Sequence, residues 1–294
     1  MEIVYYILIF VAGTFIGSFL NLVSDRLPRG KKIITGRSQC DFCKKPLGPK
    51  NLVPIFSFVF QKGRCSFCKK KLSLYYPASE ILSGLLFILA AYFSRFTFVP
   101  VAISLLAFIF YAVVFSFYLI IFLTDLKESI IPNKVVIPAI IFTALYLVFN
   151  QAYQLYNSSK IIFGGVLNEY LSKAGYWHNQ IIYSLKDLGL TLLGAVIISL
   201  FFLFLVWATK GRGMGVGDVK LGFLIGLVNG FPYGFEAIFF GFVIGAICSL
   251  ILVLMKRKKI TDTIAFGPFL ISGSVLTLLY GVGIWSWYVA LGGR

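Results

Sequence analysis

The 294-residue sequence carries little charge: only 13% of its residues are Asp, Glu, Lys or Arg, and only 11 are acidic. Globular chains typically contain about 25% charged residues. Hydrophobic residues, by contrast, make up 59% of the chain. This composition argues against a soluble protein, and it excludes a disordered chain, a collagen-like chain and a small disulfide-stapled secreted domain. Long uncharged apolar runs recur from end to end, so we expect an all-α polytopic membrane protein.

Other absences narrow the chemistry. His178 is the only histidine, and it lies far from the cysteine pairs in the sequence, which disfavours a serine or cysteine hydrolase. The glycine run at 211–217 lacks a preceding strand pattern and a Gly-Lys-Ser/Thr ending, so P-loop and Rossmann fingerprints are missing. The sequence also contains no tandem repeat and no low-complexity tract.

About eight stretches are apolar enough to cross a bilayer as helices of roughly 20 residues. They cover 3–23, 77–94, 99–123, 134–149, 187–208, 217–231, 235–255 and 264–290. The first stretch is not a cleaved signal peptide, because Glu2 precedes it and the basic residues follow it. Two glycine pairs with small-xxx-small spacing predict close helix packing, namely Gly222/Gly226 and Gly241/Gly245.

The distribution of Lys and Arg predicts the orientation. Loops 24–76, 124–134, 209–220 and 256–263 hold 22 of the 27 basic residues, and the opposite loops with the C-terminus hold five. Basic residues concentrate in cytoplasmic loops, so we expect the first set in the cytoplasm and both termini outside. This topology explains most of the net charge of +16, and no nucleic-acid partner is expected.

The chain divides into three predicted segments. Residues 1–23 form a first transmembrane helix, residues 24–76 form a small cytoplasmic loop domain, and residues 77–294 form a membrane core. The core contains an external insert at 150–186, which is polar and aromatic and to which we assign no function.

Four of the five cysteines form two Cys-x-x-Cys pairs, Cys40/Cys43 and Cys65/Cys68, with 21 residues between them. Two such turns can close a tetrahedral thiolate site around zinc. The reducing cytoplasm disfavours disulfides, and the flanking Lys and Arg residues would lower the thiol pKa values. Four cysteine ligands leave no open coordination position, so the zinc would be structural. The alternatives are a redox dithiol pair and four unrelated thiols, and Cys248 is expected to be a packing residue.

Two acidic residues lie at predicted cytoplasmic helix ends. Asp125 ends the third span and Asp218 opens the sixth, so both can lie at the same depth. Two neighbouring carboxylates cannot both ionise easily and therefore share a proton. Such a pair can hold a water, whose proton goes to the ionised Asp while the protonated Asp donates to the scissile carbonyl, as in aspartic proteases.

The neighbourhood of both acids fits this chemistry. The glycines at 213, 215 and 217 allow the backbone beside Asp218 to lie close to a substrate chain. Pro132 would end or bend the helix after Asp125. The alternative is that both acids only cap or solvate helix ends, which fits Asp218 better than Asp125.

Motifs along nearly the whole chain keep the order and spacing of one enzyme family. They are Gly17-Ser-Phe-Leu-Asn-Leu-Val-Ser-Asp-Arg-Leu-Pro28, Arg37-Ser-Gln-Cys40 to Cys43, Gly63-Arg-Cys65 to Cys68, Leu72-Ser-Leu-Tyr-Tyr-Pro-Ala-Ser-Glu80, Asp125 with Ile131-Pro132-Asn133, Gly215-Val-Gly-Asp-Val-Lys-Leu-Gly222 and Ala265-Phe-Gly-Pro-Phe269. In these motifs the chain resembles the type IV prepilin peptidases, or leader peptidase/N-methyltransferases, within the Gly-x-Gly-Asp membrane aspartyl proteases.

The resemblance implies an endopeptidase of the bacterial inner membrane whose active site faces the cytoplasm. It would remove short basic leaders from type IV prepilins or type II secretion pseudopilins, after Gly, with Asp125 and Asp218 as the catalytic pair. Residues 77–294 would then be the peptidase core, and the four cysteines would match the family's metal-binding loop. Many members also methylate the new N-terminus with S-adenosylmethionine. The expected partners are the N-terminal segments of these substrates and, through the basic loop 24–76, anionic membrane lipids.

The site of the methyl donor is unknown from the sequence. We offer only Glu80, at the cytoplasmic end of the second span, for handling the substrate amine or the donor. The alternative is that Glu80 is a helix-end acid and Gly84 a packing glycine. Glu128 is expected to be a solvated surface acid, and Arg29, like Arg26, an ordinary topology determinant.

Two other classes of function stay open. A proton-coupled transporter predicts acids deeper within the spans and an internal repeat, and the sequence shows neither. A non-catalytic membrane scaffold that displays a zinc loop predicts that Asp125 and Asp218 can be replaced without loss.

Overall fold

The structure is a computed structural model that describes residues 2–33, 38–40, 42–94, 101–164, 175–211, 213–256 and 264–292. Parts of the predicted loops 24–76 and 256–263 and of the insert 150–186 therefore lie outside the described residues. The same holds for Arg95, Lys173 and Arg294, which the topology argument counts among the external basic residues.

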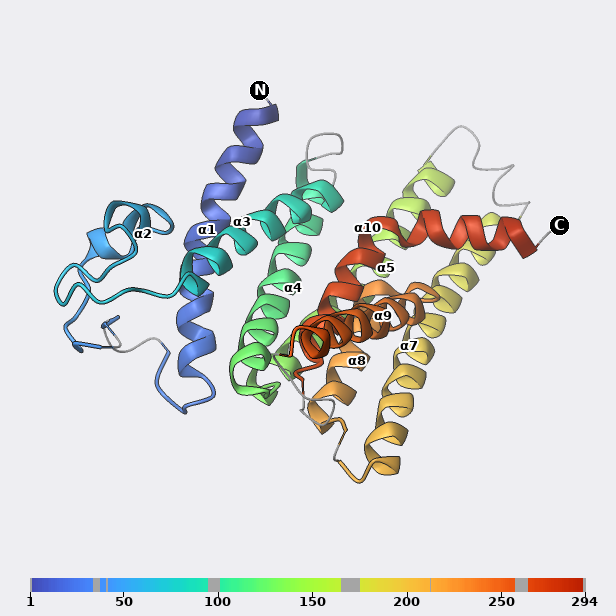
Figure 1. Cartoon of the computed structure of the whole chain (residues 1–294). Helices are drawn as coiled ribbons and strands as arrows, with labels where there is room; N and C mark the ends of the chain where they lie inside the picture. The colour runs from blue at the N-terminus through green and yellow to red at the C-terminus, as the bar shows by residue number, and fades with distance from the viewer. Residues whose placement is uncertain are drawn as a thin grey trace. The chain divides into compact units, whose positions relative to one another are not determined.

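The chain forms two compact units, Met1–Pro132 and Asn133–Arg294. Within the described ranges both units are helical and contain no strand (Figure 1). This confirms the predicted all-α class.

In its described residues, the first unit has three long helices and one extended loop. Between the first two long helices, the chain folds into the cysteine-bearing loop with two short helical turns. In chain order the elements are α1 (Glu2–Arg26), η1 (Pro49–Asn51), α2 (Phe56–Phe60), α3 (Tyr75–Ser94) and α4 (Val101–Glu128).

Five helices are described in the second unit. They are α5 (Asn133–Gly164), α7 (Tyr176–Ala208), α8 (Val216–Asn229), α9 (Tyr233–Leu254) and α10 (Gly267–Gly292). Most described residues of the predicted external insert belong to α5 and α7, so the insert lengthens these two helices. Gln151 on α5 donates from Nε2 to Asp187 Oδ2 on α7 at 2.8 Å, which joins the two extensions.

Seven helices in the described part of the chain are long and apolar enough to cross a membrane: α1, α3, α4, α5, α7, α9 and α10. The sixth predicted span, 217–231, is α8, which has only 14 residues. At 1.5 Å per residue it extends about 21 Å, less than the roughly 30 Å of the hydrocarbon core. α8 ends at Gly230, whose φ of +71° and ψ of 179° lie in a region that essentially only glycine adopts.

Close contacts at glycines hold α1 against α3. A Cβ atom at Gly17 would lie 2.5 Å from Ser83 Cβ and 3.2 Å from Glu80 Cα, and one at Gly84 would lie 2.6 Å from the Phe10 ring. Real Cβ atoms are not accommodated at such distances, so the two backbones approach because these residues lack side chains. The crossing places Glu80 beside α1, and the predicted packing role of Gly84 is confirmed.

The two glycine pairs predicted to pack closely do so within the second unit. A Cβ atom at Gly226 would lie 2.6 Å from Ala195 Cα on α7, and one at Gly241 would lie 3.1 Å from Leu270 Cα on α10. Large apolar side chains such as Phe204 and Phe239 are exposed on the helices, as expected for surfaces that face lipid tails.

Candidate metal centre and candidate active-site residues

The four loop cysteines form a cluster. The Sγ atoms of Cys40, Cys43, Cys65 and Cys68 all lie within 4.8 Å of one another, and those of Cys40 and Cys68 are 3.9 Å apart. Four sulfurs at about 2.3 Å from a tetrahedral zinc are separated by about 3.8 Å. All four thiols are free of disulfides. The cluster can therefore hold a metal ion, and its donor set fits a structural zinc site.

The two cysteine pairs adopt the same local fold. In each, the N–H of the first cysteine donates to the carbonyl of the lysine five residues later, and the N–H of the lysine four residues later donates back to the cysteine carbonyl, at 2.9–3.1 Å. The lysine four residues after the first cysteine has φ near +57° in both. The matched residues are Cys40, Lys44 and Lys45 in the first arm and Cys65, Lys69 and Lys70 in the second.

The two arms contact each other through cation–π pairs. Lys45 Nζ lies 5.5 Å from the centroid of the Phe67 ring in the second arm, and Lys70 Nζ lies 4.9 Å from that of Phe42 in the first. Each arm thus supplies a cation for the aromatic ring of the other. Such exposed cation–π pairs contribute about 0.5–1 kcal/mol each.

The thiol pKa values follow from local hydrogen bonds. Backbone N–H groups of Cys68 and Phe67 lower the pKa of Cys65 to about 6. The Lys70 N–H lowers that of Cys68, but burial and hydrogen bonds with the other thiols outweigh it and raise the pKa of Cys68 to about 11. The prediction that flanking basic side chains lower these pKa values is therefore wrong as to cause for Cys65 and as to direction for Cys68.

Glu80 connects the membrane helix α3 to the cysteine loop. Its side chain is buried, and Oε2 accepts a hydrogen bond of 2.8 Å from the backbone N–H of Ile55. Ile55 has φ +61° and ψ −54°, a region that β-branched residues rarely enter and that needs support from surrounding contacts. The carboxylate supplies one such contact, so Glu80 is more than a helix-end acid.

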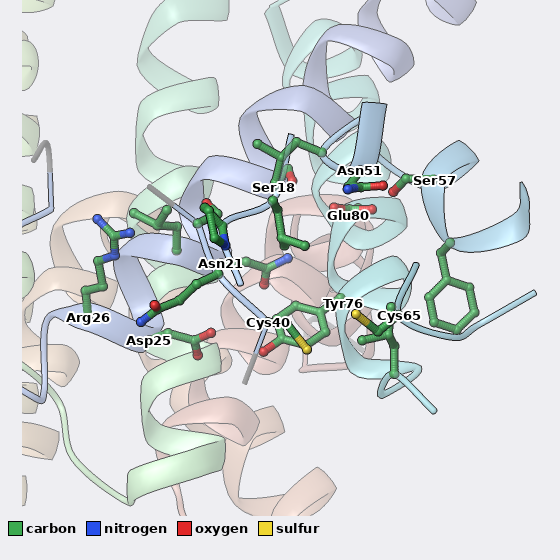
Figure 2. A pocket seen from close by; sticks show the side chains of 18 of the residues that line it. Ser18, Asn21, Asp25, Arg26, Cys40, Asn51, Ser57, Cys65, Tyr76 and Glu80 are labelled. Atoms are coloured by element: carbon green, nitrogen blue, oxygen red, sulfur yellow. The ribbon is translucent and has the colours of Figure 1, made fainter. Parts of the chain in front are cut away.

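A cavity of about 970 Å³ lies within the first unit between α1, α3 and the cysteine loop (Figure 2). Ser18 and Asn21 on α1 and Tyr76 and Glu80 on α3 line it. Figure 2 shows Asn21 among the lining side chains, with Arg26 on one side of it and Glu80 on the other. The cavity wall carries charges of both signs. Its acidic residues are Asp25 and Glu80, and its six basic residues are Arg26, Arg29, Lys31, Lys32, Lys44 and Lys127.

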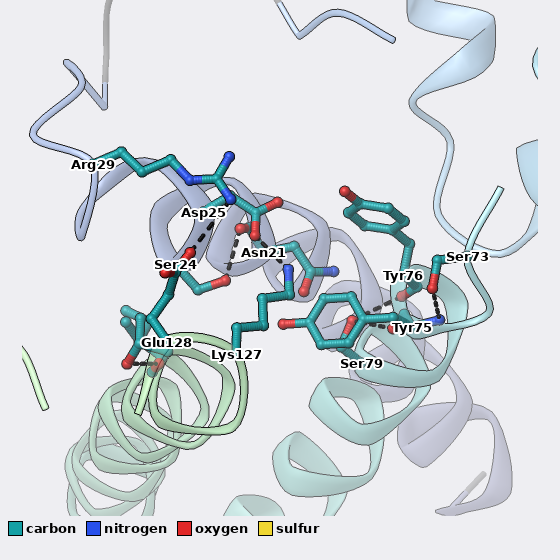
Figure 3. Close-up of polar contacts among 12 residues, drawn as sticks. Asn21, Ser24, Asp25, Arg29, Ser73, Tyr75, Tyr76, Ser79, Lys127 and Glu128 are labelled. Carbon is teal, nitrogen blue, oxygen red and sulfur yellow. Dashed lines mark hydrogen bonds and ion pairs between the residues drawn. The ribbon is translucent and has the colours of Figure 1, made fainter. Parts of the chain in front are cut away.

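Ion pairs connect the C-terminal ends of α1 and α4 (Figure 3). Lys127 pairs with Asp25, and its Nζ lies 3.7 Å from the centroid of the Tyr75 ring. Arg29 Nη2 lies 3.3 Å from Glu128 Oε1, and both side chains are exposed. Glu128 is thus a surface acid as predicted, and Arg29 has a specific partner in addition to its predicted role in topology.

Asp125 lies in the last turns of α4 in the first unit. Its residue exposure is 5%. Its carbonyl accepts from the Ser129 N–H at 2.8 Å, and Ser129 takes φ +51° as the helix stops. Pro132 follows shortly after. The helix therefore ends where the proline predicts, and a buried acid lies at that end.

Asp218 lies in the first turn of α8 in the second unit. It is 9% exposed, and its Oδ2 accepts the Gly215 N–H at 3.0 Å. This contact caps the helix N-terminus, so the capping role considered from the sequence is present. Only one carboxylate oxygen makes this contact. Nearby, Lys220 Nζ donates to Asn133 Oδ1 at 2.7 Å and fixes the start of α5 against α8.

Models of two protein families match the chain. The bacterial Peptidase A24 N-terminal domain matches residues 11–94, and the type IV leader peptidase family matches residues 112–250. The chain is also 34% identical over 285 residues to a prepilin leader peptidase/N-methyltransferase of Bacillus subtilis, an alignment that covers 97% of this chain and 98% of that protein. The chain belongs to the type IV prepilin (leader) peptidase family.

More distant family members match over similar lengths. Proteins of the same description from Aeromonas salmonicida and Pseudomonas aeruginosa are 26% and 25% identical, covering 97% and 96% of this chain and 94% and 92% of their own lengths. No solved structure gives a significant match to the chain. The four cysteines and Glu80 fall in the N-terminal family match, and Asp125 and Asp218 fall in the leader peptidase match.

Asn21 and Asp25 were not predicted as functional residues, although both fall in the N-terminal family match. A signal was present: Gly17, Asn21 and Asp25 recur every four residues, which places them on one face of a helix. Polar residues on one stripe of an otherwise apolar span indicate a buried polar surface, and here Asn21 and Asp25 both line the cavity.

Proposed function

We propose that this protein removes the short basic leader of type IV prepilins at the cytoplasmic face of the bacterial inner membrane and then methylates the new N-terminus. The observation that carries this proposal is the match along 97% of the chain to a protein named prepilin leader peptidase/N-methyltransferase. Type II secretion pseudopilins are a second substrate class that the proposal includes, with cleavage after Gly in both.

Asp125 and Asp218 are the proposed catalytic pair. Each is buried within its own unit and lies at the end of a helix, and Asp218 is flanked by glycines that leave room for a substrate backbone. The ionised carboxylate takes a proton from water while the water oxygen bonds to the scissile carbonyl carbon. The protonated carboxylate gives its proton to the carbonyl oxygen. The C–N bond then breaks, the leaving amine receives a proton from the first carboxylate, and one hydroxyl of the tetrahedral carbon returns its proton to the second carboxylate as the new carboxyl group forms.

The proposed roles of the other segments follow from their chemistry. Zinc held by the four cysteines stabilises the loop domain 24–76, which has little hydrophobic core of its own. The basic surface of this loop contacts anionic lipid headgroups and would not attract a basic leader directly. Residues 77–294 form the proposed peptidase core, with residues 1–23 as the first membrane anchor. The apolar N-terminal segment of the substrate lies against the spans near the two aspartates, and no nucleic acid takes part.

Methyl transfer is the second proposed activity. S-adenosylmethionine, when bound, supplies an electrophilic methyl group on a positively charged sulfur. The unprotonated amine of the new N-terminus uses its lone pair to form an N–C bond, while the C–S bond breaks and its electron pair returns to sulfur. The amine then releases one proton. Glu80, a buried carboxylate that lines a cavity, is proposed to act in handling the donor or the substrate amine.

Cleavage of a prepilin by membranes that contain the protein tests the peptidase function. Asp125→Asn and Asp218→Asn should each lower the cleavage rate about a hundredfold or more, since each removes a group that transfers protons. Asn at position 218 can still accept the Gly215 N–H, so the helix cap is kept. Glu128→Gln, which changes an exposed acid less than one turn from Asp125, is the matched control and should cleave normally.

The outcomes separate the possible failures. If the wild type does not cleave prepilins, the proposed function is wrong. If the wild type cleaves and both Asn variants cleave at the same rate, the assignment of the catalytic pair is wrong.

A further inference from the structure

The cavity in the first unit contains a buried polar group without a partner. Asn21 is 3% exposed and lines the cavity, and neither Oδ1 nor Nδ2 of its side chain has a hydrogen-bond partner among the residues that the structure describes. Burial of an amide without partners is unfavourable. Among the described residues that line the cavity, only Asn21 has buried side-chain atoms that lack a partner, whereas Asn51 Oδ1, for example, accepts from Gln61 Nε2 at 3.1 Å. The Nδ2 donor and the Oδ1 acceptor of Asn21 are therefore available to a ligand in the cavity.

The shape and charge of the cavity restrict the ligand. A volume of about 970 Å³ lies within the range of small-molecule sites, roughly 300–1,000 Å³. The wall carries the buried carboxylate of Glu80 and that of Asp25, and it also carries cations such as Arg26. A ligand that fits has positive and negative groups together with a neutral part that both donates and accepts hydrogen bonds.

S-adenosylmethionine has this combination of groups. Its ammonium and sulfonium are positive, its carboxylate is negative, and the edge of its adenine presents an amino donor beside a ring-nitrogen acceptor. An Asn side chain pairs with that edge through both amide atoms. The residues present thus fit the donor that the proposed methyl transfer requires.

We infer that the cavity between α1, α3 and the cysteine loop binds S-adenosylmethionine, with the Asn21 amide recognising the adenine edge and Glu80 facing the positive part of the donor. This inference rests on the proposed methyltransferase function and assigns that activity to the first unit. Because Glu80 also accepts from the Ile55 N–H of the loop, the loop and the membrane helices build the site together.

Binding to the purified full-length protein tests the inference without turnover. The probe is S-adenosylhomocysteine, the demethylated product, measured by calorimetry in detergent. Asn21→Leu keeps the size of the side chain and removes both hydrogen-bonding atoms, so binding should weaken about tenfold or more. The matched control is Ser83→Ala on α3. Ser83 Oγ is also buried without a partner, but Ser83 does not line the cavity, so binding should be unchanged.

A second probe tests recognition of the base. S-inosylhomocysteine carries an oxygen in place of the adenine amino group, so the wild type should bind it more weakly than S-adenosylhomocysteine. Asn21→Leu should bind the two alike. Equal affinities in the wild type, or unchanged affinities in Asn21→Leu, would overturn the inference.

Photo-crosslinking of radiolabelled S-adenosylmethionine to the wild type keeps the inference testable if Asn21→Leu fails to fold, which loss of bound zinc would reveal. Label in peptides from residues 14–33 or 72–84 supports the site, and label confined to residues 133–294 contradicts it. Absence of any binding by a wild type that cleaves prepilins refutes the donor site and leaves the peptidase function standing. Binding by a wild type that does not cleave refutes the peptidase function instead.

Discussion

The missing side chains of two glycines allow α1 and α3 to pack closely in the first unit. The Gly17 backbone lies against Ser83 and Glu80, and the Phe10 ring lies against Gly84. This close approach places the carboxylate of Glu80 where it can reach the Ile55 N–H and the cavity. A glycine on a membrane helix therefore positions a polar site that lies partly in the cysteine loop.

Gly17→Ala should destabilise the protein by about 1–3 kcal/mol, the usual cost of inserting a methyl group into a packed contact. The added Cβ would lie 2.5 Å from Ser83 Cβ and 3.2 Å from the Glu80 backbone, so the helices must move apart. The measurement is the thermal unfolding midpoint of the purified protein in one detergent. Gly189→Ala on α7 is the control, because no atom lies within 4 Å of its added Cβ, and it should keep or raise the midpoint. A Gly17→Ala midpoint equal to that of the wild type would show that the contact is not tight.

At the scale of elements, the cysteine loop consists of two arms with the same turn. Each arm contributes two sulfurs to the cluster and one lysine to the aromatic ring of the other arm. Apart from α2, with five residues, and a three-residue turn, the loop has no helix among its described residues. The folded structure of the loop therefore depends on the four-cysteine cluster, to which both arms contribute.

Removal of zinc should unfold the loop and leave the membrane helices in place. We expect one zinc per purified chain, and treatment with a strong chelator or Cys40→Ser should abolish it, since three thiolates bind the ion more weakly than four. Hydrogen exchange should then rise at residues 38–72 and stay low in α9. Cys248→Ser is the control because Cys248 lies on α9, outside the cluster, and it should retain the metal. Unchanged zinc content in Cys40→Ser would refute the metal site.

At the scale of the whole molecule, two compact units carry different parts of the proposed chemistry. The unit Met1–Pro132 contains the cysteine cluster, the cavity and Asp125, and the unit Asn133–Arg294 contains Asp218. The two proposed catalytic acids belong to different units, so the proposed peptidase chemistry would need residues of both. The proposed donor site requires only the first.

The predicted orientation is tested with native lysines and a membrane-impermeant acylating reagent. In right-side-out vesicles, Lys160 and Lys186 should react, since both are exposed on the extensions of α5 and α7. In inside-out vesicles, Lys45 and Lys69 should react instead, because basic loops stay in the cytoplasm. Mass spectrometry of the peptides gives the result, and the opposite pattern would invert the topology and the proposed cytoplasmic site.

Much of the fold and part of the site could be predicted from residue types and short-range spacing. Seven of the proposed spans were recognisable because a helix that crosses lipid must be apolar along about 20 residues. The cysteine cluster was recognisable because a Cys-x-x-Cys pair forms a metal-binding turn within four residues. The length of α8 was less evident, since the apolar run continues past Gly230, where the helix ends.

The sequence by itself determined the membrane class, the family and the cysteine cluster, since these depend on composition and local pattern. Only the tertiary structure decided that Glu80 accepts a hydrogen bond from Ile55, 25 residues away. It also decided that Asn21 is buried at a cavity, where its amide has no hydrogen-bond partner among the described residues. Both facts arise from the packing of α1 on α3 beneath the folded loop. Hydrogen bonding of a buried group depends on which distant segments surround it, and spacing along the chain does not encode that directly.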